Sequence, residues 1–345
     1  MSRILPLRVL ALLLALALVA AACGDDDTTE AADETAEDSA ATGDDEADDG
    51  ESAIEDIATP TPVPTPLTPG GECAEPVVDA AADPEAPPVD ITDLSVKPTV
   101  ELPDTAPTEL VTEDIVEGEG DTVDSGDFVI MQYVGVSCSS GEQFDASWDR
   151  GQPFSVVLGQ GAVIAGWDEG IVGMALGGRR LLVIPPDLAY GDTGSGSGSI
   201  PPGDTIAFVV DLIGFVPADH ELPEPTVPDA PVDELTTTDL VEGDGAEAGP
   251  ESIVWVHYRG VTQSDGNEFD ASLPRGLDQP LIAQLAPGQL IDGMLEGIAG
   301  MQVGGVREIV IPADLAYGER GAGEGLIGPD ETLVFVVSLH SVFEF

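Results

Sequence analysis

About the last two thirds of the chain contain the same sequence unit twice. The motif Tyr-Xaa-Gly-Val occurs at Tyr133 and again at Tyr258, 125 positions later. The motif Asp-Leu-Ala-Tyr-Gly begins at Asp187 and again at Asp314, 127 positions later, so two residues are inserted between the blocks, near 277–278. The matched blocks extend over about 105 residues, which is longer than the repeat of a solenoid. Each copy is therefore expected to be a domain with its own core.

Within each copy, most apolar residues alternate with a period of two. This pattern indicates strands, and in the first copy it covers residues 128–136, 180–185 and 205–213. A single short segment, 164–174, has apolar residues at helical spacing instead: Ile164, Trp167, Ile171 and Met174. Many strands and one short helix predict an α+β fold, in which an antiparallel sheet curls around the helix.

The N-terminus has the features of an export signal. Arg3 and Arg8 precede an apolar run at 9–22, which is about 14 residues long, whereas roughly 20 are needed to span a bilayer. The run ends in Val-Ala-Ala-Ala before Cys23 and resembles a bacterial lipobox. The resemblance implies that Cys23 is lipidated and anchors the exported protein to the outer face of a bacterial cell membrane. The alternative is ordinary cleavage that leaves Cys23 as a thiol.

A stalk follows the signal. Residues 24–56 are almost entirely Ala, Asp, Glu, Thr and Ser with no aromatic residue, so they cannot bury enough apolar surface to fold and are expected to be disordered. Residues 59–69 (TPTPVPTPLTP) predict a polyproline II spacer. The acidic run at 45–50 partly resembles a calcium-binding loop, but an alanine occupies a ligand position and flanking helices are lacking, which favours a solvated charge run.

These observations divide the chain into five parts. They are a signal peptide at 1–22, an acidic and Pro-rich stalk at 23–107, a first domain at 108–217, a Pro-rich linker at 218–234 and a second domain at 235–345.

The charge balance excludes some partners. The chain has 66 acidic and 10 basic residues, for a net charge of −56. Nucleic acid is excluded because phosphate contacts require clusters of Lys and Arg, and contact with a membrane is expected through the lipid anchor only. His220, His257 and His340 are far apart and lack zinc-ligand spacing, so no metal is expected, and His257 is interpreted as a packing or surface residue.

The motifs of the first domain occur in a specific order. They are Phe144-Asp-Ala-Ser-Trp-Asp-Arg150, Phe154, Val163-Ile-Ala-Gly-Trp167, Ala189-Tyr-Gly, Ile200-Pro-Pro and Phe208. In this order and spacing, nearly all of 108–217 resembles the FKBP-type peptidyl-prolyl isomerases, and 235–345 resembles the same family with gaps in the pattern. The resemblance implies two FKBP-like domains, isomerase activity on Xaa-Pro bonds and no cofactor.

The resemblance also implies roles for individual residues. Trp167 would form the floor under a prolyl ring, the Ile164 N–H and the Tyr190 hydroxyl would bind substrate carbonyls, and Asp145 would lie near the isomerising bond and pair with Arg150. The implied pocket is Tyr133, Phe144, Asp145, Arg150, Phe154, Val163, Ile164, Trp167, Tyr190, Ile200 and Phe208. Each aromatic residue taken alone is compatible with plain core packing, and only their joint spacing favours a pocket.

The second domain departs from the pattern. Its implied pocket is Tyr258, Phe269, Asp270, Arg275, Leu281, Leu290, Ile291, Met294, Tyr317, Ile327 and Phe335. Met294 replaces the floor Trp and Leu281 replaces Phe154, which keeps the pocket apolar but removes the flat surface against which a prolyl ring stacks. Weaker isomerase activity, or binding alone, is expected there.

This chemistry needs no nucleophile or metal. The Xaa-Pro amide barrier is about 18–20 kcal/mol, and a twisted amide, which has lost its resonance, is less dipolar than the planar one. An apolar pocket therefore favours the twisted form relative to water. We expect a monomeric isomerase that acts on proline-containing, exported polypeptides and binds rapamycin-type macrolides. The alternative is a non-catalytic chaperone or peptide-binding lipoprotein, especially through the second domain.

Two cysteines remain if Cys23 is lipidated. Cys73 and Cys138 are an even pair in an oxidising compartment, and we hypothesise a disulfide between the end of the stalk and the turn before Phe144. Two free thiols or a cross-chain bridge are the alternatives.

Overall fold

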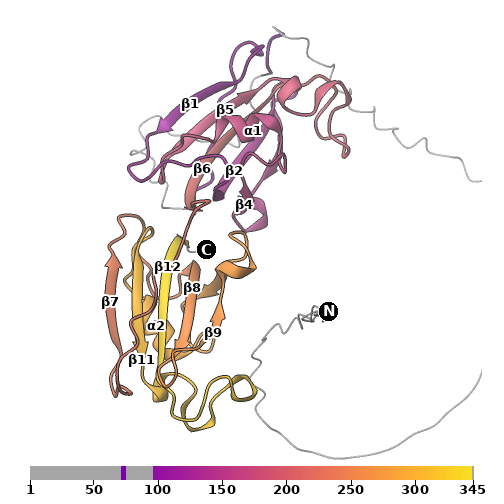
Figure 1. Cartoon of the computed structure of the whole chain (residues 1–345). Coiled ribbons are helices and arrows are strands. Elements are labelled where there is room, and N and C mark those ends of the chain that lie inside the picture. Colours follow the sequence, from indigo (N-terminus) through magenta and orange to yellow (C-terminus); the bar gives the residue numbers. More distant parts are fainter. Residues whose placement is uncertain (1–70, 75–95, 344–345) are drawn as a thin grey trace, which may run out of the picture. The chain divides into compact units, whose positions relative to one another are not determined.

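The computed structural model describes residues 71–74 and 96–343 (Figure 1). The signal peptide, Cys23 and most of the stalk lie outside the described residues. In the described part of the chain, every helix is too short or too polar to cross a membrane.

The first domain is a six-stranded antiparallel sheet with one α-helix, as predicted. The strand order is β1-β5-β6-β2-β3, and β4 pairs with β2. The helix α1 contacts β5 (Figure 1). The bounds are β1 Val111–Val116, β2 Phe128–Ser137, β3 Gln143–Ala146, β4 Phe154–Val157, β5 Arg179–Ile184, β6 Ile206–Val216 and α1 Ala165–Gly170, with 3-10 turns η1 Trp148–Arg150, η2 Pro186–Leu188 and η3 Gly191–Thr193.

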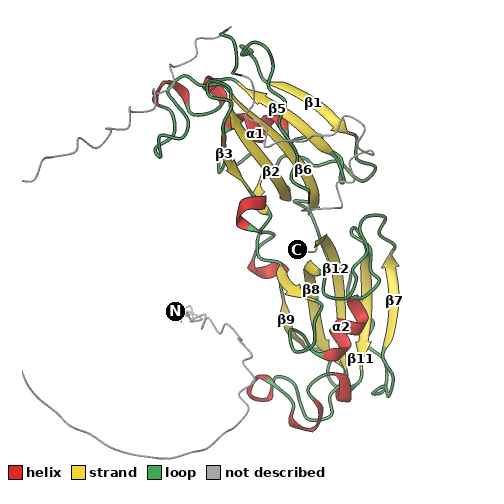
Figure 2. Ribbon diagram, turned by 180° about the vertical axis from the view of Figure 1, so that it is seen from behind, coloured by secondary structure: helices red, strands yellow, loops and turns green. Residues whose placement is uncertain are grey.

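The second domain repeats this topology. Its strand order is β10-β8-β12-β11-β7, with β9 paired to β8 and α2 in contact with β11 (Figure 2). The bounds are β7 Thr236–Val241, β8 Ile253–Thr262, β9 Glu268–Ala271, β10 Leu281–Gln284, β11 Val306–Ile311, β12 Leu333–Phe343 and α2 Asp292–Ile298, with 3-10 turns η4 Leu273–Arg275, η5 Ala313–Leu315, η6 Gly318–Arg320 and η7 Gly323–Gly325.

Each helix is short and lies very close to its sheet. The helix expected over 164–174 is the six-residue α1, which ends at Gly170, and Gly173 beyond it has a φ of +82° that favours glycine. A Cβ on Gly166 would lie 2.3 Å from Ile184 Cγ2, so only glycine allows α1 to approach β5 this closely. Gly293 of α2 has the same relation to Ile311, at 2.2 Å.

The central strand β2 is buried on both faces, because each face of the sheet is covered. Successive side chains of a strand point to opposite faces. Tyr133 and its alternate neighbours face α1, whereas Val134 and Val136 face the other way and pack with Val100.

Residues 96–106, which we assigned to the stalk, thus cover the outer face of the first sheet. Val100 is 4% exposed there, and Leu102 packs against the same cluster. The apolar residues near the end of the acidic segment complete the burial of a sheet that is apolar on both sides.

A disulfide joins Cys73 to Cys138. The short described segment 71–74 also makes backbone contacts with the first domain. The Ala74 N–H donates to the Cys138 carbonyl at 2.8 Å, and Glu72 forms an isolated bridge with Thr105. The disulfide therefore ties segment 71–74 to the first domain directly after β2, and the Glu72–Thr105 bridge ties it to the segment that covers the sheet.

The linker, 218–234, contacts the second domain although it forms neither helix nor strand. The Thr226 N–H donates to Glu308 at 2.6 Å, and the Val232 N–H donates to Thr332 Oγ1 at 3.2 Å. Glu224 pairs with Arg259 at 2.7 Å. The residues that precede each domain thus pack on that domain.

Candidate active site

Five aromatic rings meet on the helix side of the first sheet. They come from four strands and the helix, so that residues distant in sequence enclose one apolar site. The Trp167 ring lies edge-on to its neighbours, with centroids 5.0 Å from Tyr133, 5.6 Å from Phe154 and 5.1 Å from Phe208. Phe144 is edge-on to Phe208 at 5.5 Å. Edge-to-face packing at these distances is the arrangement that aromatic quadrupoles favour.

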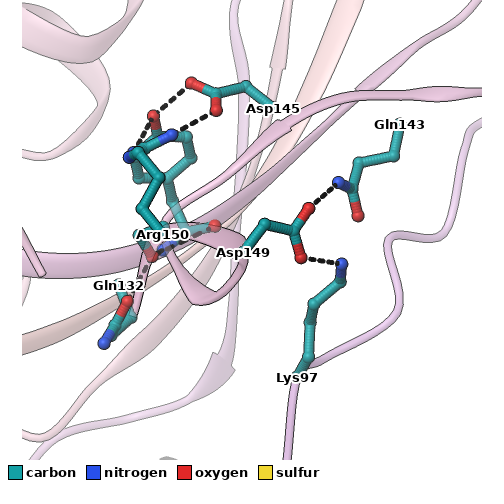
Figure 3. Close-up of polar contacts among 8 residues, drawn as sticks. Lys97, Gln132, Gln143, Asp145, Asp149 and Arg150 are labelled. Atoms are coloured by element: carbon teal, nitrogen blue, oxygen red, sulfur yellow. Dashed lines mark hydrogen bonds and ion pairs between the residues drawn. The ribbon is translucent and has the colours of Figure 1, made fainter. Parts of the chain in front are cut away.

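A polar network lies beside these rings. The Tyr133 hydroxyl donates to Asp145 Oδ2 and accepts from Arg150 Nη2 at 2.7 Å, and Arg150 Nη1 pairs with Asp145 Oδ1 (Figure 3). The Arg150 guanidinium carbon is 5.3 Å from the Tyr133 ring centroid. Burial, followed by the hydrogen bond to Asp145, raises the pKa of Tyr133 to about 12. The hydroxyl therefore stays protonated and keeps Asp145 oriented at neutral pH.

The turn that carries Arg150 is contacted by Lys97, which lies outside the domain boundary that we expected. Asp149 accepts from Lys97 Nζ at 2.8 Å and from Gln143 Nε2 at 2.7 Å (Figure 3). The bonds from Lys97 and then Gln143 lower the pKa of Asp149. Sequence reasoning missed this contact, since it assigned Lys97 to the stalk.

A second support lies behind Tyr133. Its backbone N–H donates to Ser147 Oγ at 2.8 Å, and the Ser147 hydroxyl donates to Gln132 Oε1. Ser147 precedes η1, so this bond joins the strand that carries Tyr133 to the turn that carries Arg150. Phe-Asp-Ala-Ser occurs at 144–147 and again at 269–272, and the presence of its serine in both copies is a sequence signal from which this support could have been found.

The remaining predicted residues border the same site. Ile164 is the N-cap of α1, and Val163, Ile164 and Ile200 pack with the core that contains Trp167. Tyr190 is 38% exposed. Burial, and then the negative charge of Asp145, raises the pKa of Tyr190, which places its phenol near that carboxylate.

The second domain keeps the polar network. The Tyr258 hydroxyl donates to Asp270, and Arg275 reaches Asp270 at 2.8 Å and the Tyr258 hydroxyl at 3.1 Å. Burial and the hydrogen bond to Asp270 raise the pKa of Tyr258 to about 12, as for Tyr133. The carboxylate, guanidinium and phenol are therefore arranged in the same way in the two domains.

The apolar part of the second site has fewer rings. Phe269 is edge-on to Phe335 at 5.5 Å, and Tyr258 is 6.2 Å from Phe335. Met294, which is 4% exposed, takes the place of Trp167. The other predicted residues pack in the same core: Leu281, Leu290, Ile291, Tyr317 and Ile327.

A surface hollow of about 310 Å³ lies elsewhere in the second domain. It is lined mainly by polar groups near Asp239 and Arg307, and none of its lining residues is aromatic. This lining does not suit a prolyl ring, so the hollow is separate from the site described above.

Comparisons with known proteins agree with this arrangement. The family model of the FKBP-type peptidyl-prolyl cis-trans isomerases matches residues 120–213 and, a second time, residues 245–340. An FK506-binding protein from Streptomyces anulatus is 52% identical over 118 residues, which are 34% of this chain and 95% of that protein. A probable FK506-binding protein from Corynebacterium glutamicum is 51% identical over 118 residues, which are 34% of this chain and 97% of that protein.

A longer relative matches over more of the chain. The peptidyl-prolyl cis-trans isomerase FKBP9 of Rattus norvegicus is 40% identical over 220 residues, 63% of this chain and 35% of that protein. The match thus spans about a third of the length of FKBP9. With two curled antiparallel sheets, two Tyr-Asp-Arg networks and a family match over each of them, the chain belongs to the FKBP-type peptidyl-prolyl cis-trans isomerases, whose domain it contains twice.

Proposed function

We propose that the protein isomerises Xaa-Pro bonds of exported polypeptides, mainly through the first domain. The observation that carries this proposal is the aromatic enclosure around Trp167, in which Tyr133, Phe154 and Phe208 all lie edge-on to the indole. Such an enclosure holds a prolyl ring and excludes water. It therefore favours a twisted, less dipolar amide over a planar one.

The polar network supplies orientation. Because Tyr133 and Arg150 both contact Asp145, its carboxylate is held in one position at the edge of the aromatic set. Asp145 would lie near the carbonyl of the isomerising bond, and the Ile164 N–H and the Tyr190 hydroxyl would bind neighbouring substrate carbonyls. A few fixed hydrogen bonds are sufficient because the reaction breaks no covalent bond.

A non-catalytic role is the second candidate, and it applies to the second domain. The substitution of Met294 for the indole supports it, since a thioether fills apolar space without offering a flat face. In this role the second domain binds Pro-containing or unfolded segments and presents them to the first.

The proposed setting is the outer face of a bacterial cell membrane, with Cys23 as the lipidated residue and the protein acting as a monomer. The Cys73–Cys138 disulfide supports export because such bonds persist in oxidising compartments. The lipobox-like sequence before Cys23 supports anchoring, and two or more acyl chains anchor a protein stably. Cell fractionation of a Cys23→Ala variant tests this; retention in the membrane fraction would contradict it.

The activity is tested on the full chain with an NMR exchange assay on a Xaa-Pro peptide. Trp167→Ala combined with Asp145→Ala is expected to lower kcat/KM at least tenfold, and a rapamycin-type macrolide is expected to inhibit the unmodified protein. Met294→Ala is the matched control in the second domain. A rate that is unchanged by the first-domain variant would favour a binding module.

A further inference from the structure

The structure gathers all three histidines of the chain, which are far apart in sequence. His257 is in β8, His340 is in β12 and His220 is in the linker. The centroid of His340 lies 4.7 Å from that of His220 and 5.4 Å from that of His257, and His220 and His257 are 6.2 Å apart. Since His257 precedes Tyr258 in a strand, it points to the opposite face of the sheet, behind the second pocket.

His257 connects the two ends of the turn that carries Arg275. Its Nε2 lies 3.0 Å from the Leu277 carbonyl, which can only accept, so this nitrogen carries the proton. Its Nδ1 therefore accepts from the Ser272 hydroxyl, at 2.8 Å. Ser272 Oγ in turn accepts the Tyr258 N–H at 2.8 Å. Neutral His257 thus positions both the strand that carries Tyr258 and the turn that carries Arg275.

The other two histidines are poorly placed to accept a proton. His340 is 5% exposed, and its Nδ1 lies 3.1 Å from the Phe215 carbonyl, to which it donates. Its Nε2 and the His220 Nε2 are both buried without a hydrogen-bond partner among the described residues. A proton on either nitrogen would bury an unpaired charge, and two such charges would lie on adjacent rings.

The charged neighbours give little compensation. Asp219 faces His220 from the linker, and Arg275, a like charge to imidazolium, faces His257 from the turn. A metal does not account for the cluster, because both ring nitrogens of His257 make hydrogen bonds, which leaves two histidine rings, whereas protein zinc sites use three or four protein ligands. In the described part of the chain, no group of His, Cys, Asp and Glu meets the requirements of a metal site.

The first domain provides an internal comparison. Gln132 occupies the place of His257 and accepts from Ser147, the counterpart of Ser272. Ile213 corresponds to His340 by the repeat. The same serine is therefore held by a group that cannot titrate.

We propose that His257 is a positioning residue of the second pocket and that the three-histidine cluster makes this pocket sensitive to acid. Acid favours an open state of the second domain in which the cluster takes up protons. In this state the His257–Ser272 hydrogen bond is reversed and the linker is released from the second sheet, which loosens Tyr258 and Arg275, whereas the first pocket does not respond. The proposal rests on the proposed function only in treating the second pocket as a ligand site.

The direction of the pH effect follows from burial. Burial, and then the neighbouring His257, lowers the pKa of His220 to about 4, and burial also lowers the pKa of His257 and of His340. As the pH falls below 6.5, the unfolded chain takes up protons that the folded cluster refuses, so stability is full above this pH and falls from there to about 4. His220 alone would lower the folded-to-unfolded ratio at pH 5 by at most about 30-fold, since solvent screens it partly.

The four tyrosines make the test specific. Tyr133 and Tyr190 belong to the first pocket, and Tyr258 and Tyr317 belong to the second. In the full chain labelled with [15N,13C]tyrosine, lowering the pH from 7.5 to 5 is expected to shift or broaden the signals of the second pair only. His257→Gln, which copies Gln132 of the first domain, is expected to remove most of the Tyr258 response.

Several outcomes would overturn the proposal. They are a response of Tyr133 equal to that of Tyr258, no response of either, or an unchanged Tyr258 response in His257→Gln. If His257→Gln unfolds the second domain at pH 7.5, urea unfolding of His220→Gln followed at Tyr258 decides instead. The His220→Gln variant should lose less stability between pH 7.5 and 5 than the unmodified chain. An equal loss would overturn the proposal. None of these measurements requires isomerase activity, so their failure is distinct from failure of the proposed function.

Discussion

Trp167 lies edge-on to Phe208 with ring centroids 5.1 Å apart, and Met294 stands in its place near Phe335 of the second domain. The two domains thus share a fold and a polar network but differ at the position that we propose as the floor of the pocket. Trp167→Met in the full chain is expected to lower kcat/KM about tenfold, since each lost ring pair contributes roughly 0.5–1.5 kcal/mol. An NMR exchange assay on a Xaa-Pro peptide measures this. An unchanged rate would mean that the indole is only core.

The reverse substitution tests the second pocket. Met294→Trp supplies the missing flat surface beside Tyr258 and Phe335, and it is expected to raise the isomerase rate in a chain whose first pocket carries Trp167→Ala. The matched control is Met294→Leu, which changes shape without adding a ring. If the Met294→Trp and Met294→Leu variants have equal isomerase rates, a difference other than the missing ring limits the rate of the second domain.

The activity of the first pocket is expected to be independent of pH between 6 and 9. The pKa of Tyr133 is raised to about 12, so its hydroxyl keeps its proton throughout this range, and residues 108–217 contain no histidine. The quantity to measure at each pH is the difference in kcat/KM between the unmodified chain and the Trp167→Ala variant. A kinetic pKa within this range would contradict the assignment.

At higher pH the same phenol affects stability. Its pKa is about 10 in the unfolded chain and about 12 in the folded protein, so its contribution is full below pH 10 and is lost as the pH rises to 12. Tyr133→Phe should flatten the alkaline loss of stability of the first domain in urea unfolding. An identical alkaline profile for the variant and the unmodified chain would argue against this.

A buried ion pair in the first sheet predicts strong coupling between two positions. Arg179 contacts Asp211 at 2.5 and 2.6 Å, with side chains 6% and 0% exposed, and Val306 and Ser338 occupy these positions in the second domain. Asp211→Ser alone is expected to cost about 3–5 kcal/mol because it leaves a buried guanidinium uncompensated.

The double variant Arg179→Val with Asp211→Ser, which copies the second domain, is expected to cost much less than Asp211→Ser alone. Urea unfolding of the full chain measures both. Additive costs of the two single substitutions would show that the pair is not coupled.

The disulfide is expected to stabilise the first domain. Cys73 and Cys138 are 65 positions apart, and closing a loop of this length lowers the entropy of the unfolded chain by an amount worth about 4 kcal/mol. Cys73→Ser with Cys138→Ala should lower the urea midpoint of the first domain and leave that of the second domain in place. An unchanged urea midpoint of the first domain would show that the disulfide contributes no stability.

Much of the fold was predictable because it depends on local periodicity and on the repeat. The structure has strands β2, β5 and β6 where strands were expected, at 128–136, 180–185 and 205–213. The short helix α1 also lies within its expected range. The helix ends at Gly170 and is shorter than its apolar spacing predicts, and Gly173 beyond it has a left-handed backbone. Spacing reports which residues share a face, but it does not report where the backbone leaves the helical conformation.

The pocket residues were predicted from their motifs, whereas their supports were not. Asp145, Arg150 and Trp167 occur in recognisable strings. Lys97 contacts Asp149 from a segment whose composition resembles a stalk. Composition averages over a segment, and a single lysine or valine that packs on a sheet does not change the average.

The amino-acid sequence by itself determined that two similar domains follow an acidic segment and that each is an antiparallel sheet with one short helix. It also determined that the two proposed pockets differ at Trp167 and Met294. Only the tertiary structure decided what covers the outer faces of the sheets and where the histidines lie. Periodicity and motifs are local properties of the chain, but the contact between His220 and His340 depends on the path of the linker across the sheet. That path is set by the packing of residues more than a hundred positions apart, which no local pattern records.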